Sequence, residues 1–318
     1  MRRYFPGFLL LVIATGCASI AGPPPSPPLA VPAVGAPKEF TWSPLKWRPG
    51  LVLTYHVHSF MEINTGGSEQ SRSLVQLKGA DKTAKGAVRV QLLVDNLEIG
   101  SMLIDEFGNF QDALASKPEF APVFTVLAEW MQALQLSQLQ SKPFAVGETL
   151  IVDVPTTANF RRLMPQDWGR YLVPSINIRW QFTGYVRLGE TLAAAFRAEI
   201  PNILSSPIHG RDRNSREFRI DAFVGEVVDY LDAIGGYSLA QYEVLTGGGE
   251  AGGKPFSYRS VKLTTLDRER SSTDKAPGSI SPDIETRLRR LQDLREKKLI
   301  TEEEYQAHRK ELLKELVK

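Results

Sequence analysis

The sequence contains a single cysteine, so the chain cannot form an internal disulfide and its folded part depends on burial of apolar groups. Its net charge is only +2, which gives no electrostatic basis for binding nucleic acid. Its apolar N-terminal run is shorter than the roughly 20 residues that a membrane-spanning helix needs. No Gly-x-Ser-x-Gly motif or other catalytic signature is present, so we expect neither an enzyme nor a bound cofactor.

Histidine is also scarce, and only His56 and His58 lie close together in the sequence. Two imidazoles fall short of the three or four protein ligands that zinc usually has, and strand alternation places both on an outer face. We therefore predict no metal site. Asp105 and Asp221 occupy matching positions in two similar segments. Paired carboxylates for acid–base chemistry are one interpretation, and strand-end aspartates that cap turns are the simpler one.

The N-terminal segment is the most informative part of the sequence. Residues 1–3 carry positive charge, residues 8–14 are apolar, and the small residues Thr15 and Gly16 precede Cys17. This order is typical of a secretory signal peptide. Because small residues lead directly into a cysteine, the segment also resembles a bacterial lipoprotein signal, with residues 14–17 as the lipobox.

This resemblance implies that the peptide of residues 1–16 is removed by cleavage between Gly16 and Cys17, and that Cys17 then carries covalent lipid. Two or three acyl chains anchor a protein stably in a bilayer, because each buried methylene contributes about 0.8 kcal/mol. The residue after the cysteine is Ala18 rather than aspartate, which in a Gram-negative cell favours the outer membrane. The expected location is therefore the bacterial cell envelope, with membrane lipid as the partner of Cys17.

Residues 17–38 form the next segment, and 22–37 are dense in proline. Such a stretch favours an extended conformation of roughly 3.1 Å per residue, so we interpret it as a semi-rigid stalk between lipid and domain. A disordered tail with no role in spacing is the alternative. A second, polar linker is predicted at 268–281, which leaves 39–267 as the central domain.

The central domain has an apolar period of two residues along most of its length. The clearest case is 176–188, where apolar and polar residues alternate and predict a half-buried antiparallel strand. The segment 51–63 alternates in the same way. Its inner face is predicted to hold Leu51, Leu53, Tyr55, Val57, Met61 and Ile63. Further strands are predicted at 88–94, 192–200, 218–223, 226–233, 239–245 and 258–265.

One helix interrupts the strands near 119–138, where apolar residues recur at spacings of three and four. The predicted fold class is therefore α+β: a curved antiparallel β-sheet domain with one packed amphipathic helix. The similar segments 103–110 and 219–227 raise the alternative of two related β halves, although ordinary hairpins share this pattern. The glycine-rich stretch 247–253 lacks the Lys-Ser/Thr end of a phosphate loop and is interpreted as a flexible loop between strands.

Two kinds of charged loop are also predicted. Residues 211–216 cluster charge, and we interpret them as a solvated loop, with contact to lipid headgroups or an anionic polymer as the alternative. Residues 160–162 and 168–171 mix aromatic with basic side chains. Anchoring of a loop is the interpretation that we favour, and the mouth of a ligand site is the alternative.

Residues 282–318 predict a two-helix hairpin with two apolar stripes. Thr301 and Glu304 form a capping box, and Ile300 before it and Tyr305 after it are placed as a hydrophobic staple. The stripes and this motif resemble the short C-terminal domain of bacterial proteins known as SHOCT, which is thought to mediate oligomerisation or interaction. The expected oligomerisation residues are Ile284, Leu288, Leu291, Leu294, Leu299, Ile300, Tyr305, Leu312, Leu313 and Leu316.

A unit below roughly 40 residues rarely folds alone, so we expect the hairpin to bury its stripes against another surface. Self-association into a homo-oligomer is the favoured interpretation, and docking on the β domain of the same chain is the alternative. The leading functional hypothesis is a non-enzymatic binding or scaffolding lipoprotein. The alternatives are a carrier of a lipid or other hydrophobic ligand in the β domain, and an enzyme of unknown class. A pocket beneath the 119–138 helix would favour the carrier, and a filled core would favour the scaffold.

Overall fold

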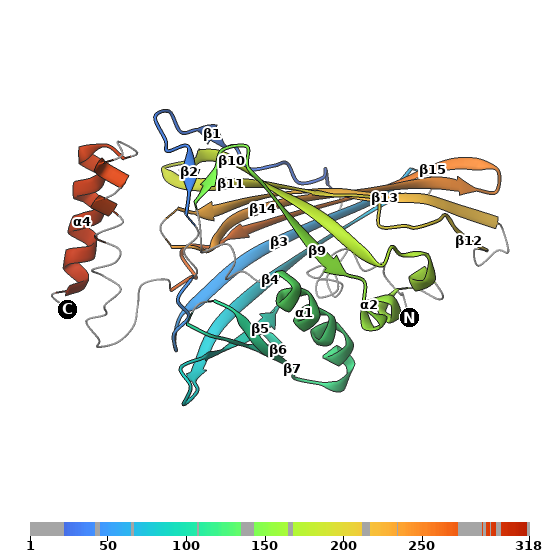
Figure 1. Ribbon diagram of the computed structural model, residues 1–318, viewed down its shortest axis with the longest axis horizontal. Helices are drawn as coiled ribbons and strands as arrows, with labels where there is room; N and C mark the ends of the chain where they lie inside the picture. The colour runs from blue at the N-terminus through green and yellow to red at the C-terminus, as the bar shows by residue number, and fades with distance from the viewer. Residues whose placement is uncertain are drawn as a thin grey trace.

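Most of the chain belongs to one antiparallel sheet of 13 strands, which Figure 1 shows as a long, twisted layer. A second sheet consists of two short strands, β2 (Glu39–Phe40) and β8 (Phe144–Ala145). The predicted antiparallel β domain is confirmed, and the fold as a whole is mostly β with few short helices. The computed structural model describes residues 22–41, 45–64, 67–106, 108–134, 143–164, 168–211, 217–233, 235–272, 288, 291–292, 294–296 and 300–316.

The strand order brings the N-terminal and C-terminal parts of the β domain together in the middle of the sheet, where β15 pairs with β3. Two strands lie beside this order: β9 (Thr149–Pro155) pairs with β10, and β12 (Ile208–Arg211) pairs with β13. The order is β1 (Val31–Pro32), β10 (Ser175–Leu188), β11 (Thr191–Ile200), β13 (Glu217–Asp232), β14 (Ser238–Ala251), β15 (Lys254–Leu266), β3 (Val52–Ile63), β4 (Gly67–Lys82), β5 (Val88–Val94), β6 (Leu97–Ile104) and β7 (Phe110–Ala115).

The predicted helix is confirmed as α1 (Ala121–Leu134), which follows a short 3-10 turn, η1 (Pro118–Phe120). It contacts β7 at one end of the strand order and β9 at the other end. The helix therefore bridges the two edges of the curved sheet and covers one of its faces (Figure 1). Two short elements, α2 (Ala158–Leu163) and η3 (Trp168–Tyr171), lie beyond β9 on the same side.

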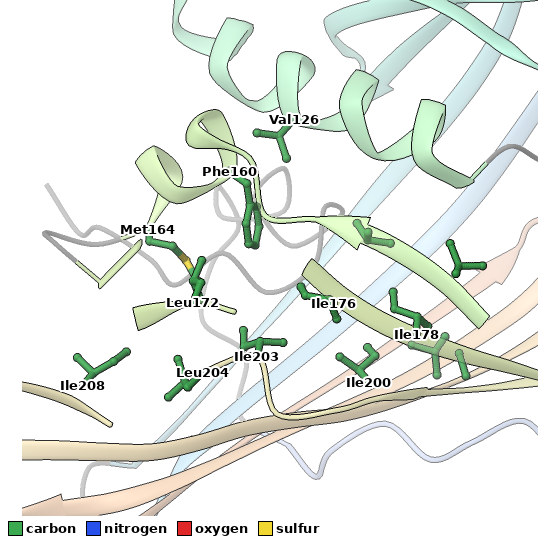
Figure 2. Packing of buried hydrophobic residues seen from close by; sticks show 14 of the residues in the cluster. Val126, Phe160, Met164, Leu172, Ile176, Ile178, Ile200, Ile203, Leu204 and Ile208 are labelled. Carbon is green, nitrogen blue, oxygen red and sulfur yellow. The ribbon is translucent and has the colours of Figure 1, made fainter. Parts of the chain in front are cut away.

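Apolar side chains on α1 divide between two core clusters. Val126 points toward Phe160 and joins a cluster with Ile176 and Ile200 from β10 and β11 (Figure 2). Phe124 and Leu127 instead pack with side chains of β3, β4, β5 and β6. The helix thus lies between the two ends of the sheet because its apolar surface is wide enough to serve both.

Some of the predicted strand boundaries are wrong. The strands predicted at 218–223 and 226–233 form one continuous strand, β13, with a register shift near Asp221. The stretch predicted as a glycine-rich loop begins inside β14, where Gly247 leaves room for the ring of Phe223. Only Gly252 and Gly253 form the turn, with positive φ angles of 57° and 76°.

The two similar segments do not have the same structure. Asp105 lies in a tight turn between β6 and β7, where its carboxylate accepts a hydrogen bond of 2.8 Å from the Asn109 amide. Asp221 lies within β13 and forms an ion pair of 2.8 Å with Arg219. The capping prediction is confirmed for Asp105 and wrong for Asp221, so the similarity of sequence reflects local β patterns and gives no support to two related halves.

The proline-rich segment lies along the sheet over part of its length. Its short strand β1 pairs with Val186 and Arg187 of β10. Near its start, the Gln70 side-chain amide on β4 donates a hydrogen bond to the Gly22 carbonyl. The predicted semi-rigid stalk therefore does not include residues 31–32, because they pair with β10 of the domain.

The first residues of the predicted polar linker are hydrogen-bonded to the sheet. The Ser272 amide donates to the Val52 carbonyl at 2.9 Å, and the Thr54 amide donates to the Ser271 hydroxyl at 2.9 Å. Residues 268–272 therefore continue alongside β3 after β15 ends. The remainder of the predicted linker, 273–281, lies outside the described residues.

The C-terminal region contains one helix with defined bounds, α4 (Glu302–Leu316). Its capping box is confirmed: the Glu304 amide donates to the Thr301 hydroxyl at 3.2 Å, and the Thr301 amide donates to the Glu304 carboxylate at 2.8 Å. The described residues of this region show no clear hairpin, because most of the first predicted helix lies outside them. None of the helices in the described ranges has the length and apolarity to cross a membrane.

Candidate functional site

Polar side chains form a group on the face of the sheet that α1 covers. Lys262 on β15 lies directly opposite Glu243 on β14 and opposite Ser59 on β3. Directly opposed residues point to the same face of a sheet, so these three side chains share a face. Val227, opposite Glu243, belongs to the core cluster that contains Val126 of α1, so this face is the covered one.

Two more hydroxyl groups lie beside these three side chains, one on β15 and one on the adjacent strand β4. Ser73 on β4 and Thr264 on β15 are both directly opposite Val57 on β3. Val57 belongs to the core cluster that contains Phe124 of α1, so the two hydroxyls also face the covered interior. We call Ser59, Ser73, Glu243, Lys262 and Thr264 the polar floor.

Four of the five residues of the polar floor are buried, and Ser59 is half-buried with a buried hydroxyl oxygen. Lys262 and Glu243 are 2% and 4% exposed, and the Lys262 ammonium contacts the Glu243 Oε2 atom in an ion pair. Burying two charges is unfavourable unless they pair and their remaining hydrogen-bonding atoms find partners. The ion pair meets only the first of these conditions, because Glu243 Oε1 has no hydrogen-bond partner.

Three hydroxyls of the polar floor also lack a hydrogen-bond partner. The hydroxyl oxygens of Ser59, Ser73 and Thr264 are buried and have no hydrogen-bond partner within the chain. The indole nitrogen of Trp180 on β10 is a further buried donor without a partner. Roughly nine in ten buried polar groups in proteins are hydrogen-bonded, so a group of exceptions on one face requires an explanation.

A further carboxylate lies beside the polar floor. Asp229 on β13 is directly opposite Gln241 of β14, and its Oδ1 atom accepts a hydrogen bond of 2.6 Å from the Ser238 hydroxyl. Desolvation raises the pKa of Asp229 to about 6, against the lowering effect of the hydrogen bonds from Ser238 and the Tyr230 backbone. Burial also raises the pKa of Tyr55, and the charge of Asp229 adds to that effect.

Apolar clusters border the polar floor on both sides. Leu53, Tyr55 and Val75 lie toward one end of the central strands and pack with α1. Val227, Ala198 and others lie toward β10 and β11. The arrangement can hold a group that donates and accepts hydrogen bonds, and it surrounds that group with hydrocarbon.

This site was not predicted, although the sequence contained a sign of it. In the segment 51–63 the inner-face pattern of apolar residues is interrupted at Ser59. Glu243 and Lys262 interrupt the patterns of β14 and β15 in the same way. Each interruption alone is common, and only the strand pairing shows that they meet on one face.

The predicted lipid site falls outside the described residues, since these begin at Gly22 and exclude both Gly16 and Cys17. Of the predicted oligomerisation residues, Ile284 and Leu299 also lie outside them. Leu313 and Leu316 belong to α4, and their side chains are not described.

The other residues of the two predicted stripes are buried or half-buried within the same chain. Leu291, Tyr305 and Leu312 form one apolar cluster, against which Leu288 and Ile300 pack. Ile300 and Tyr305 therefore make the predicted hydrophobic staple. The guanidinium of Arg295 adds a stacking contact, at 4.4 Å from the centre of the Tyr305 ring.

The tail also contacts the β domain. Leu294 is buried together with Leu192 of β11 and Ala233, which follows β13. Arg187 of β10 forms an ion pair of 3.0 Å with Glu304 of α4. The Thr301 amide and this guanidinium lower the pKa of the Glu304 carboxyl. These contacts correspond to the docking alternative, and the prediction of a homo-oligomer is not tested by them.

The two histidines lie on the opposite face from the polar floor, as alternation predicted. His56 Nε2 contacts the Asp267 carboxylate at 2.9 Å, and His58 Nε2 contacts the Gln70 side-chain oxygen at 3.0 Å. The two rings therefore have separate partners. Within the described part of the chain, no group of three or more potential metal ligands gathers.

The aromatic and basic groups act as loop anchors. Arg161 in α2 donates hydrogen bonds to the carbonyl groups of Thr156 at 2.9 Å and Val173 at 3.0 Å, and so ties the loop after β9 to the start of β10. Of the charged loop, Arg211 forms an exposed ion pair of 3.4 Å with Glu217, and 212–216 lie outside the described residues.

Comparison with known proteins does not assign the chain to a family. No protein-family model matches it, and no curated protein is significantly similar to it. The functional proposal therefore rests on the residues described above.

Proposed function

We propose that this protein is a lipid-anchored component of the bacterial cell envelope whose β domain binds a ligand and does not transform it. The observation that carries the proposal is the polar floor: buried side chains of four adjacent strands present polar atoms without partners to the face that α1 covers. Such atoms are unfavourable in a sheet that serves only as a scaffold. They are expected where another molecule supplies the missing hydrogen bonds.

The packing of α1 on the sheet limits where the ligand lies. Phe124 of α1 packs so closely on the backbone of β6 that only glycine fits at position 100. The space between Phe124 and β6 is therefore filled, as a scaffold would require. The ligand is expected above the central strands β14, β15, β3 and β4, where Val57 separates Ser73 from Thr264.

Binding is a better account than catalysis. The polar floor contains no cysteine or histidine, and its lysine is neutralised by its glutamate. An activated nucleophile is hydrogen-bonded to its base, and the Ser59, Ser73 and Thr264 hydroxyls of the floor have no such partner. The enzyme alternative is therefore not part of this proposal.

The lipid anchor would hold this domain close to the bilayer. Gly22 contacts Gln70 on β4, and it lies only five positions after Cys17. An extended chain of that length spans at most roughly 18 Å. If Cys17 carries acyl chains, the β domain lies next to the lipid surface rather than at the end of a long stalk.

The anchor is tested by expressing the full chain in a Gram-negative bacterium that is grown with labelled palmitate. The proposal expects label in the mature protein and recovery with the membrane fraction, whereas the Cys17→Ser variant should be unlabelled. A wild-type product that is unlabelled, or that still carries Met1, would refute the anchor.

Ligand binding is tested by native mass spectrometry of the full-length protein extracted from those cells. A non-covalent adduct that is released by denaturation is the expected result. The variant Thr246→Val should carry the same adduct as the wild type, because Thr246 is an exposed residue of β14 away from the polar floor. Protein that carries no adduct and binds no added amphiphile would refute the carrier function.

A further inference from the structure

We infer that the polar floor recognises the uncharged, hydroxyl-bearing end of an amphipathic molecule. This inference rests on the proposed function and specifies the chemical class of the ligand. It follows from three properties of the floor: its charge balance, its hydrogen-bonding atoms and its apolar borders.

The charge balance of the floor disfavours an ionic group. Lys262 and Glu243 neutralise each other, and both are almost fully buried. A carboxylate or phosphate on the ligand would compete with Glu243 for the Lys262 ammonium and would leave one negative charge without a partner. Asp229 lies on the next strand and adds negative charge when it is ionised, which disfavours an anion further. A cationic group would in turn compete with Lys262 for Glu243.

The unpartnered atoms match a group with several hydroxyls. The Ser59, Ser73 and Thr264 hydroxyls can each donate one hydrogen bond and accept others, and Glu243 Oε1 can only accept when ionised. These atoms belong to neighbouring strands, which lie roughly 4.8 Å apart. A glycerol or sugar hydroxyl both donates and accepts, so it can bond a hydroxyl and the carboxylate in turn. A simple ester or ether cannot, because it has no donor for Glu243.

The borders of the floor fit the other end of the ligand. Leu53, Tyr55 and Val75 continue the covered face toward one end of the central strands. Val227, directly opposite Glu243, and Ala198, directly opposite Val227, continue it across the sheet toward β11. A hydrocarbon chain is the chemistry that such borders accept, since it loses contact with water without needing hydrogen bonds.

The experiment compares three amphiphiles that share a dodecyl-length chain: monolaurin, laurate and dodecyltrimethylammonium. Their head groups are hydroxylated and neutral, anionic and cationic. Binding is measured by calorimetry on the full chain with Cys17→Ser, below the critical micelle concentration of each compound. We expect monolaurin to bind at least tenfold more tightly than either charged compound.

Two variants connect the preference to the floor. Thr264→Val and Ser73→Ala remove unpartnered hydroxyls with little change of shape and are expected to weaken monolaurin binding about tenfold, while Thr246→Val should leave it unchanged. Circular dichroism and thermal unfolding confirm that each variant is folded before binding is measured. If these hydroxyls had only a structural role, the substitutions would change the stability of the protein or leave it unaltered. The dissociation constant for monolaurin would then stay the same.

The possible failures are distinct. If none of the three compounds binds, the proposed carrier function fails. If they bind with equal affinity, or if the floor variants bind monolaurin as the wild type does, only the present inference is overturned. A destabilised Thr264→Val variant with unchanged binding would show that ordered water, rather than a ligand, completes the floor.

Discussion

The ammonium group of Lys262 and the carboxylate of Glu243 meet directly across the β14–β15 ladder, where both side chains are almost fully buried. A buried ion pair of this kind adds little net stability, because desolvation offsets the attraction between the charges. Removing one partner is much more harmful than removing both, since a single buried charge remains. The effect on stability therefore depends on whether one member of the pair or both are replaced.

We predict that Lys262→Met alone lowers the free energy of unfolding by about 3–5 kcal/mol, because Glu243 keeps its burial and loses its counter-ion. The double variant Lys262→Met/Glu243→Leu should recover most of that loss. Urea denaturation measures both.

The control for this prediction is an exposed ion pair in the same sheet, Arg197–Glu226 at 2.9 Å, whose side chains are 48% and 42% exposed. Arg197→Met should change stability by less than about 1 kcal/mol. If the single and double variants of the buried pair are equally unstable, the two charges do not depend on each other and our account of the floor is wrong.

A second prediction concerns the contact between α1 and β6. A Cβ atom at position 100 would lie within 2.6 Å of the Leu114 carbonyl oxygen and even closer to the Phe124 ring. Gly100→Ala should therefore destabilise the protein by about 1–3 kcal/mol through overpacking. Gly248→Ala is the matched control, because its new Cβ would meet only the Phe256 carbonyl oxygen at 3.4 Å. Similar midpoints of thermal unfolding for the two variants would contradict the close packing of α1 on the sheet.

The strands could be predicted from the sequence, but their neighbours could not. A period of two residues is a local property, so β3, β5, β10 and β11 were predicted close to their observed bounds. The pairing of β15 with β3 depends on contacts between residues about 200 positions apart, which no local pattern contains. For the same reason Ser59, Glu243 and Lys262 appeared as separate interruptions, and only their pairing makes them a site.

Prediction from local pattern also failed where polar or glycine residues continue a strand. The glycine-rich stretch 247–253 favours a loop when the sequence is considered alone, since glycine weakens strands. In the structure it permits close approach of Phe223, and the strand continues because the ladder between β13 and β14 is long enough to support it. The capping box at Thr301 was predicted correctly because it depends on residues three positions apart.

The third prediction concerns pH. The pKa of Asp229 is about 6 in the folded protein against an ordinary value of 3.8, so the folded chain holds this proton over a range in which the unfolded chain has lost it. Asp229 therefore lowers stability progressively as the pH rises from about 4 to about 6, and the loss is constant above that range. The Asn variant, Asp229→Asn, still accepts the Ser238 hydrogen bond and does not titrate.

We expect the stability of Asp229→Asn relative to the wild type to rise by about 1–3 kcal/mol between pH 4 and pH 7, as measured by urea denaturation at several pH values. A difference between Asp229→Asn and wild type that does not vary with pH would mean that the carboxylate is well solvated.

The last prediction distinguishes docking of the tail from self-association. Leu294 packs with Leu192 and Ala233 of the β domain, and Glu304 forms an ion pair with Arg187. If these contacts hold the tail on its own chain, Leu294→Ala should leave the solution mass unchanged and make residues near α4 more sensitive to limited proteolysis. The lost burial should lower the stability of the docked tail by about 2–3 kcal/mol, since a truncated leucine leaves a cavity. Gln306→Ala, on the exposed surface of α4, should alter neither property.

Self-association through the same stripes predicts a different outcome. Deleting residues 281–318 would then reduce an oligomer to a monomer in sedimentation velocity, and Leu294→Ala would shift the mass at low concentration. Docking predicts a monomer both before and after the deletion, because Leu291, Tyr305 and Leu312 already cover one another and leave little apolar surface for a second copy. A full-length chain that sediments as an oligomer and loses that state on deletion would establish self-association. Unchanged protease sensitivity in Leu294→Ala would independently show that the contact with Leu192 does not hold the tail.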